Sequence, residues 1–162
     1  MINLKPFRQS ADFCGPASLV ILLGYYNFHM SEKELGNLSN TTREFGTEPE
    51  SLTSTLRKLG FDAESKQHGT WEGLKKLIDE DIPVIVNWWS DYGAPADGHY
   101  SVVHKMTDRT ISLMDPEIGA TRRIPKAKFM KQWYDFYYNG SRNDKWYLYI
   151  KKDPSRYTLT GQ

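Results

Sequence analysis

The 162-residue chain contains only one cysteine, Cys14. A single cysteine excludes an internal disulfide framework and any zinc site built from several thiolates. Reducing surroundings fit this cysteine usage, and residues 1–10 contain no apolar stretch long enough for a signal peptide. We therefore expect a cytoplasmic location, with a secreted form that has lost its leader as the alternative.

Long hydrophobic runs and an excess of charge of either sign are also missing. The longest apolar run extends from Leu19 to Leu23, far short of the roughly 18 residues that a membrane span needs. The 21 Lys and Arg residues against 20 Asp and Glu residues leave a formal net charge of +1. Because phosphate neutralisation needs a sustained surplus of cations, we expect neither a membrane span nor a nucleic-acid partner. One basic stretch is interpreted as a solvated face; it comprises Arg122, Arg123, Lys126, Lys128 and Lys131.

The length and composition are those of one globular domain. Hydrophobic residues make up 39% of the chain and aromatic residues 14%, enough to fill a core. We expect a single domain over residues 1–162, with a helical half at about 1–81, a sheet half at about 82–152 and a tail at 153–162.

The first half shows helical periodicity. Cys14–Phe28 is apolar on every side, which is typical of a helix in the middle of a protein. Ser31 and Glu34 form a capping box at the start of a second helix. The pattern predicts four helices, at Cys14–Phe28, Ser31–Leu38, Glu48–Leu59 and Thr70–Glu80.

After Pro83 the pattern becomes that of short strands, rich in β-branched and aromatic residues. A short helix at Lys126–Tyr134 precedes the last of them. The predicted strands are Val84–Trp88, His99–Lys105, Thr110–Met114 and Lys145–Ile150. The fold class is therefore α+β, a helical lobe packed on an antiparallel sheet, with a cleft expected where the two lobes meet.

Cys14 stands at the start of the most hydrophobic predicted helix. A helix N-terminus carries unpaired N–H groups and a partial positive charge, worth ~0.3–1 kcal/mol to a nearby anion. Such a position favours the thiolate, which is the nucleophilic form of cysteine. The alternative is that Cys14 is an inert, buried, small hydrophobic residue.

A nucleophilic thiol needs a base, and His99 is the best of four histidines because it lies at a strand entrance beside a loop. His29 and His68 are interpreted as solvated turn residues, and His104 as a core histidine. Side chains alternate along a strand, so His99 and His104 point to opposite faces and cannot bind one metal ion together. We expect neither a metal nor a cofactor.

Asp115 can supply the acceptor that orients a histidine base. If Thr107, Asp108 and Arg109 form the hairpin loop, Asp115 lies opposite Ser101, on the sheet face of His99 and within side-chain reach of it. A two-residue loop would turn Asp115 to the other face. The alternative is that Asp115 and Pro116 simply form a turn.

Two further features could complete a site. Gln9 precedes Cys14 by five residues, and its side-chain amide together with the Cys14 N–H could hold an oxyanion. Trp88, Trp89 and Tyr92 could line a cleft for an extended peptide, or else pack in the core or in a lid.

Three short motifs give the chain a resemblance to a known family. The sequence resembles the bacteriocin-processing, double-glycine leader cysteine peptidases of the papain-like superfamily in Gln9-x4-Cys14-Gly-Pro-Ala-Ser, then Gly98-His99-Tyr and then Asp115-Pro116. The resemblance implies a papain-like fold and a peptide or protein substrate. By resemblance Cys14 is the nucleophile, His99 the general base and acid, Asp115 the orienting residue and Gln9 the oxyanion donor. Because the chain carries no membrane or ATP-hydrolysing domain, we expect a stand-alone member.

Two other functions stay open. The word CGPASL also resembles phytochelatin synthases, which implies a thiol acyltransferase as an alternative. A non-catalytic peptide-binding module on the same fold is the second alternative. The sequence does not determine the oligomeric state.

Overall fold

The computed structural model describes residues 1–151, and the predicted tail at 153–162 lies outside them. The helices are α1 (Cys14–Tyr25), α2 (Glu32–Leu38), α3 (Pro49–Lys58), α4 (Trp71–Asp79) and α5 (Lys126–Gln132). The strands are β1 (Ala63–Lys66), β2 (Val84–Ser90), β3 (Asp97–Met106), β4 (Thr110–Asp115), β5 (Ala120–Pro125), β6 (Tyr134–Phe136), β7 (Arg142–Asp144) and β8 (Tyr147–Ile150).

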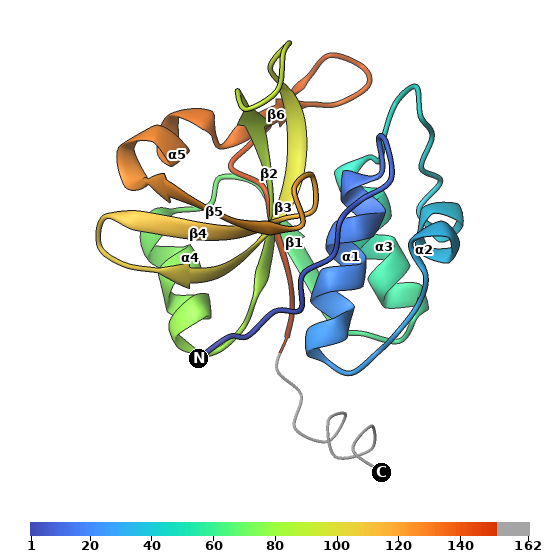
Figure 1. Ribbon diagram of the computed structural model, residues 1–162, viewed down its shortest axis with the longest axis horizontal. Helices are drawn as coiled ribbons and strands as arrows, with labels where there is room; N and C mark the ends of the chain where they lie inside the picture. The colour runs from blue at the N-terminus through green and yellow to red at the C-terminus, as the bar shows by residue number, and fades with distance from the viewer. Residues whose placement is uncertain (152–162) are drawn as a thin grey trace.

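The chain folds into two lobes, as the α+β prediction requires. Helices α1, α2 and α3 form one lobe, and the sheet with α4 and α5 forms the other (Figure 1). Six strands pair in the order β1-β8-β2-β3-β4-β5, and every pairing is antiparallel. Strands β6 and β7 form a separate two-stranded sheet.

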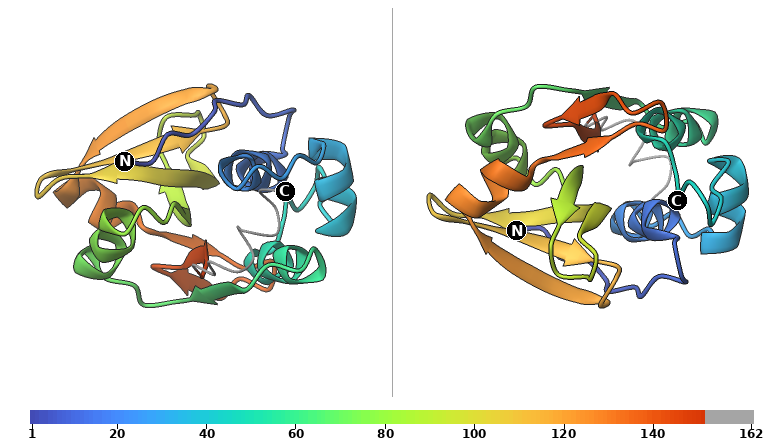
Figure 2. Two further views of the ribbon diagram at one scale, coloured as in Figure 1. Left: turned by 90° about the horizontal axis from the view of Figure 1, so that it is seen from below. Right: turned by 90° about the horizontal axis from the view of Figure 1, so that it is seen from above.

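Helix α1 is the centre of the helical lobe. Its residues Leu19, Ile21, Leu22 and Leu23 are all at most 2% exposed, which confirms the interpretation of an apolar helix in the middle of the protein. Views along the perpendicular direction show α1 between the sheet and α2 (Figure 2). Burial of each such side chain stabilises the fold by about 1.5–3 kcal/mol, so these residues hold α1 in a fixed position in the lobe.

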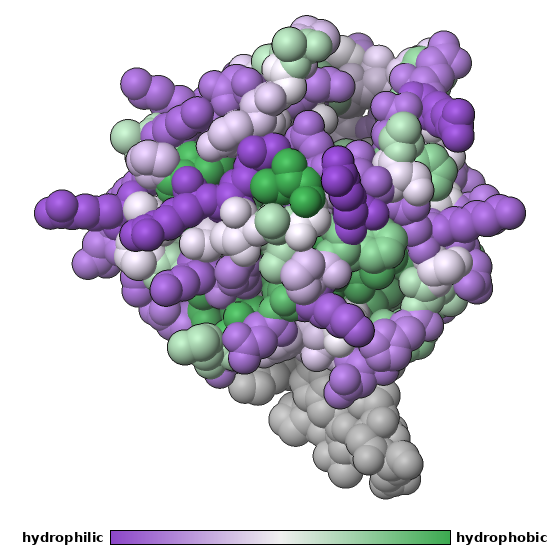
Figure 3. Space-filling model, viewed as in Figure 1, coloured by the Kyte–Doolittle hydropathy of each residue, from purple (hydrophilic) through white to green (hydrophobic). Residues whose placement is uncertain are grey.

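Alternate residues of the central strands enter two separate cores. Ile85 and Val102 pack with α1 and α3, whereas Val86 and Val103 pack in a second cluster with α4 and α5. Period-two alternation therefore buries both faces of the central strands. On the face seen in Figure 3, hydrophobic residues appear as small separate areas among polar side chains.

Several strands were absent from the prediction. Strand β1 (Ala63–Lys66) lies within the expected helical half and pairs with β8 at the sheet edge. Its sequence AESK contains no β-branched or aromatic residue, and β5, ATRRIP, is mostly polar. These segments become strands because a neighbouring strand offers backbone partners, which no local pattern reveals.

The loop between β3 and β4 differs from the prediction. Thr107 N–H donates to Thr110 O over 2.9 Å, and Met106 faces Ile111, so the loop has two residues instead of three. A β-bulge at His104 then shifts the register by one residue, and Val102 faces Met114. The bulge restores the register that the longer loop was expected to supply, so Asp115 still reaches the face of His99.

Within residues 1–151, no helix combines the length and the apolar character that crossing a bilayer requires.

Candidate active site

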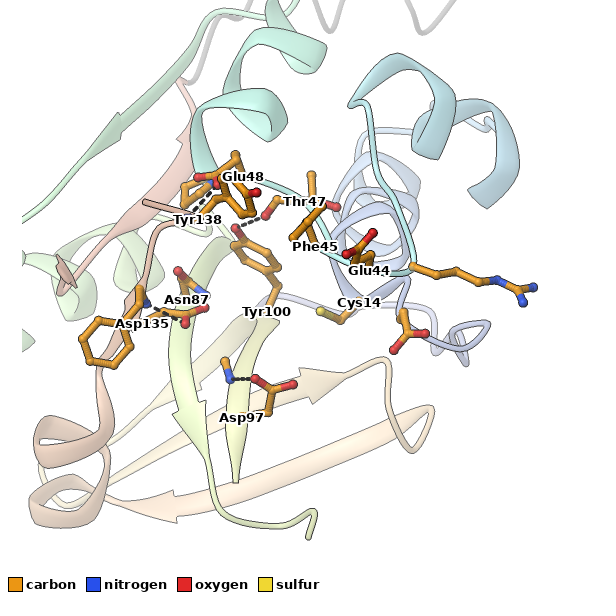
Figure 4. A pocket seen from close by; sticks show the side chains of 16 residues that line it. Cys14, Glu44, Phe45, Thr47, Glu48, Asn87, Asp97, Tyr100, Asp135 and Tyr138 are labelled. Atoms are coloured by element: carbon orange, nitrogen blue, oxygen red, sulfur yellow. Dashed lines mark hydrogen bonds between the residues drawn. The ribbon is translucent and has the colours of Figure 1, made fainter. Parts of the chain in front are cut away.

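The Cys14 thiol lies at the first residue of α1, half-buried and without a disulfide partner. Phe13 caps the helix without a side-chain hydrogen bond, so its side chain satisfies none of the first N–H groups of the helix. Figure 4 shows the Cys14 side chain projecting into a hollow between the lobes. A Cβ atom on Gly15 would lie 2.7 Å from Thr47 Oγ1, so glycine allows the loop before α3 to approach the helix start.

His99 reaches the thiol from the sheet lobe. The side chain is buried, its Nε2 contacts Asp115 Oδ1, and it is within hydrogen-bonding reach of Cys14. Because Asp115 occupies Nε2, Nδ1 is the ring nitrogen available to the sulfur. Burial alone would lower the pKa of His99, but the negative charge at Cys14 and the hydrogen bond to Asp115 outweigh it and raise the pKa to about 10.

Asp115 is completely buried and has a hydrogen bond on each carboxylate oxygen. Oδ1 also accepts the Glu117 N–H at 2.9 Å, and Oδ2 accepts Arg122 Nε at 2.6 Å. Burial raises the pKa of Asp115, but the hydrogen bonds from His99 and Arg122 outweigh it and hold the pKa below its ordinary value. The carboxylate therefore stays ionised beside the imidazole.

Gln9 lines the same hollow as Cys14 and His99. Its backbone N–H donates to Pro116 O at 2.8 Å, which fixes the N-terminal segment beside the end of β4. The side-chain Oε1 is buried and has no hydrogen-bond partner among residues 1–151. Its side-chain amide is therefore not held by a structural hydrogen bond through this oxygen.

Two hollows meet at Cys14. The histidine hollow has a volume of about 290 Å³ and includes Gln9, His99 and Glu117, together with residues 93–95. A second hollow, the acidic hollow, has a volume of about 320 Å³ and also includes Cys14. Its walls come from residues 43–49, the start of β3 and the β6–β7 hairpin, and they include Phe45, Asn87, Tyr100, Asp135, Phe136 and Tyr138.

Three aromatic residues were predicted to line a peptide cleft, or else to pack in the core or in a lid, and each has defined partners in the structure. Trp88 is fully buried, donates from Nε1 to Ser101 Oγ over 3.0 Å, and packs edge-on against His99 at 5.8 Å between ring centroids. Trp89 stacks on Tyr134. Tyr92 lies under the Arg122 guanidinium, 4.0 Å from the ring centre.

None of these three aromatic residues lines either hollow that reaches Cys14, as far as residues 1–151 show. The physical reason is that each ring already has an aromatic or cationic partner inside the fold. The aromatic residues at the hollow, Phe45, Phe136 and Tyr138, were missed because they lie in loops or at a strand end without a local pattern.

The other histidines lie outside the site. His29 is exposed, and His68 lies in a left-handed turn with φ of 61° and faces Asp144 at 3.2 Å. His104 was predicted in the core, but the bulge leaves it half-buried and hydrogen-bonded to Thr121 Oγ1 at 3.0 Å.

One group of side chains has the composition of a metal site. Ligand atoms of His99, Asp115 and Glu117 lie within 4.8 Å of one another. Arg122 already faces both carboxylates, with its Nη2 3.6 Å from Glu117 Oε2. A metal ion there would have to overcome repulsion from the guanidinium, so these residues fit a hydrogen-bonded cluster better than a metal centre. Sequence reasoning missed Arg122, which was assigned to a solvated basic face.

The chain is similar in sequence to known proteins. The chain is 30% identical over 129 residues to the lactococcin-G-processing and transport ATP-binding protein LagD of Lactococcus lactis, covering 78% of this chain and 17% of LagD. It is 34% identical over 116 residues to an uncharacterized protein of Methanothermobacter marburgensis, covering 71% of this chain and 73% of that protein.

Solved structures show the same fold. The peptidase domain of Streptococcus ComA, a bifunctional ABC transporter, superposes with a TM-score of 0.71 at 23% identity over 93% of this chain and 100% of that domain. A double-glycine motif protease in complex with its leader peptide gives a TM-score of 0.68 at 18% identity, over 93% of each chain. Residues 7–143 match the Peptidase C39 family. The chain therefore belongs to the Peptidase C39 family and has its papain-like, α+β fold.

Proposed function

We propose that this protein is a cysteine peptidase that hydrolyses peptide bonds through a thioester on Cys14. The observation that carries the proposal is the buried chain of contacts from Arg122 through Asp115 to His99, which ends beside the thiol at the start of α1. Buried charged groups of this kind are costly to maintain, and they are typical of sites that hold an ionised nucleophile.

In the first half-reaction, the sulfur of Cys14 attacks the carbonyl carbon of the scissile bond. The carbonyl oxygen gains negative charge, and the Cys14 N–H and the Gln9 side-chain amide stabilise it. His99, protonated at neutral pH because of its raised pKa, then donates a proton to the departing amine. The carbon–nitrogen bond breaks, and the acyl group remains on the sulfur as a thioester.

In the second half-reaction, water attacks the thioester. His99, now neutral, accepts a proton from that water, and the carbon–sulfur bond breaks to release the carboxylic acid. Asp115 keeps the imidazole in one orientation throughout, because its Oδ1 faces Nε2 and its Oδ2 is held by Arg122. Every residue then returns to its starting protonation state.

The two hollows suggest how a peptide would lie. The departing amine must be near His99, so the leaving side of the substrate occupies the hollow that contains His99 and Gln9. The acyl side then lies in the acidic hollow. LagD is named as a lactococcin-processing protein, and one structural neighbour contains a leader peptide, which supports a peptide substrate.

The test is cleavage of a diverse peptide library followed by mass spectrometry. We expect cleavage by the wild-type chain and none by Cys14→Ala, with His29→Gln as a matched control at an exposed histidine. An electrophilic probe should label Cys14, and labelling should fall in His99→Ala. Cleavage that persists in Cys14→Ala would refute the proposal, and addition of an amine to the product instead of water would indicate acyl transfer.

A further inference from the structure

The acidic hollow beside Cys14 has an unusual charge for a chain whose formal net charge is only +1. Five carboxylates line it, two of them from residues 43–49: Asp12, Glu44, Glu48, Asp97 and Asp135. The lining contains one basic residue, Arg43, which is exposed. Figure 4 shows several of these carboxylates around the space next to Tyr100 and Cys14.

The carboxylates of the acidic hollow lack cationic partners. Within residues 1–151, no lysine, arginine or histidine forms an ion pair with any of the five. The donors that they do have are neutral: Asp135 accepts from Asn87 Nδ2 at 2.7 Å, and Glu48 accepts from the Tyr138 N–H at 2.9 Å. The five carboxylates are therefore not paired with a cation, and the single Arg43 of the lining leaves most of the negative charge uncompensated.

The titration of buried groups reflects this uncompensated charge. Burial, together with the charges of Asp97 and Glu48, raises the pKa of Asp135 to about 6. Burial and the same acidic surroundings also raise the pKa of Tyr100 well above its ordinary value. A cation that entered the hollow would lower the electrostatic cost of ionising Asp135.

Aromatic rings form the rim of the hollow. Phe45 and Tyr138 approach from the two lobes and meet edge-to-face, with 4.3 Å between ring centroids. They are 54% and 71% exposed, and the neighbouring Phe136 is 49% exposed. Exposed ring faces beside carboxylates are a combination that attracts lysine and arginine side chains, through cation–π contact and charge together.

The arrangement of the carboxylates distinguishes among cationic ligands. Among residues 1–151, no three of these carboxylates converge within the 4.8 Å that would define a site for a metal ion. They instead line a hollow of about 320 Å³ whose lining also includes Cys14. An extended cationic side chain fits this distribution better than a compact ion.

Resting on the peptidase function proposed above, we propose that the acidic hollow binds a lysine or arginine side chain on the acyl side of the scissile bond, so that this peptidase selects cationic peptides. The preference should be stronger on the acyl side, because Glu44, Glu48 and Asp135 line only the acidic hollow, whereas Asp12 and Asp97 line the histidine hollow as well.

The first experiment measures kcat/KM for matched peptides. Starting from a cleaved library sequence, each acyl-side residue is replaced in turn by arginine, norleucine or glutamate, and leaving-side residues are replaced in the same way. We expect arginine to exceed norleucine by about tenfold at one or two acyl-side positions, with glutamate slowest, and less than about threefold variation on the leaving side. The preference should shrink in high salt, because screening weakens charge pairs near the surface.

Variants then locate the preference in the hollow. Glu44→Gln is the mildest change, because Glu44 is exposed, and Glu48→Gln retains an acceptor for the Tyr138 N–H. We expect each to reduce the arginine-to-norleucine ratio by about twofold to fivefold. Glu72→Gln, an exposed acid on α4, is the matched control and should leave the ratio unchanged.

A binding measurement separates this inference from the peptidase proposal. Fluorescent arginine and norleucine peptides are titrated against Cys14→Ala, where no turnover can occur, and the arginine peptide should bind about tenfold more tightly. Thiol-dependent cleavage with no preference for basic residues would overturn the charge selectivity and leave the peptidase function standing. Preferential binding without any cleavage by the wild-type chain would sustain the hollow as a cationic-peptide site and overturn the peptidase.

Discussion

Arg122 Nε donates to Asp115 Oδ2 over 2.6 Å, while the other oxygen of the same carboxylate faces His99. The Arg122 side chain is only 15% exposed, and its guanidinium lies over the Tyr92 ring. The carboxylate is thus held from both sides, and its orientation does not depend on the histidine alone. Arg122 is a positioning residue in this scheme, since it reaches the thiol only through Asp115 and His99.

We predict that Arg122→Gln lowers kcat/KM by about tenfold to a hundredfold, because a misoriented Asp115 misplaces His99. Stability should also fall, by about 3–5 kcal/mol, since a buried carboxylate loses its charged partner. Arg122→Lys should restore part of the stability but less of the activity, because an ammonium cannot reproduce the Nε geometry. Equal recovery of both quantities would indicate that only charge matters here. Arg123→Gln, at the next residue of β5, is the control.

The pH dependence of turnover tests the coupling between His99 and Asp115. Because the raised pKa of His99 keeps the imidazole protonated at neutral pH, activity should persist well above pH 6.5 and decline as His99 loses its proton near pH 10. Asp115→Asn removes one cause of that raised pKa, so its alkaline decline should begin at lower pH. The residual rate of this variant should be at least about a hundredfold lower. Superimposable alkaline limbs in the two proteins would contradict the coupling.

Asp135 makes stability depend on pH. Its pKa is raised from 3.8 to about 6, so the folded state binds the proton more tightly than the unfolded chain does. The folded state therefore loses stability as pH rises from about 4 to 6 and loses no more above that range.

We predict that Asp135→Asn removes this loss. The Tm at pH 8 minus the Tm at pH 4 should therefore be higher in the variant than in the wild-type chain. The comparison uses the difference because the variant also changes the hydrogen bonds with Asn87 and the Phe136 N–H. Thermal unfolding at both pH values provides the measurement. An unchanged difference in Tm would show that Asp135 titrates normally.

Gly98 tests the close approach of β3 to β6. A Cβ atom at this position would lie 2.1 Å from Asp135 Oδ2, so Gly98→Ala must displace the carboxylate or the strand that carries His99. We expect a stability loss of about 1–3 kcal/mol and a larger relative loss of activity. The double variant Gly98→Ala with Asp135→Ala should recover stability. Gly24→Ala is the control, because a Cβ atom there meets nothing within 4 Å.

Much of the fold followed from periodicity. The helices at Cys14–Tyr25, Glu32–Leu38, Pro49–Lys58 and Trp71–Asp79 lie within their predicted ranges, since helical spacing and capping residues are local properties. The central strands also lie where β-branched residues predicted them. Strands β1 and β5 were missed because their pairing, not their composition, makes them strands.

The candidate site was predicted less evenly. Short sequence motifs pointed to Cys14, His99, Asp115 and Gln9, and the fold brings these four residues together. Their chemical roles remain proposals. Trp88 was predicted either in a substrate cleft or in the core, and the structure buries it in the core beside His99. Alternation along β2 gives the face of a side chain but not what covers that face.

The sequence by itself determined that Cys14 begins a buried helix and that His99 lies at a strand entrance, because helix caps and strand alternation depend on near neighbours. Only the tertiary structure decided that a bulge at His104 brings Asp115 into register, and that Arg122 lies beside it. It also decided that five carboxylates, from four segments that lie far apart in the sequence, line one hollow. Such contacts depend on how the lobes and hairpins pack, and packing joins residues that share no local pattern.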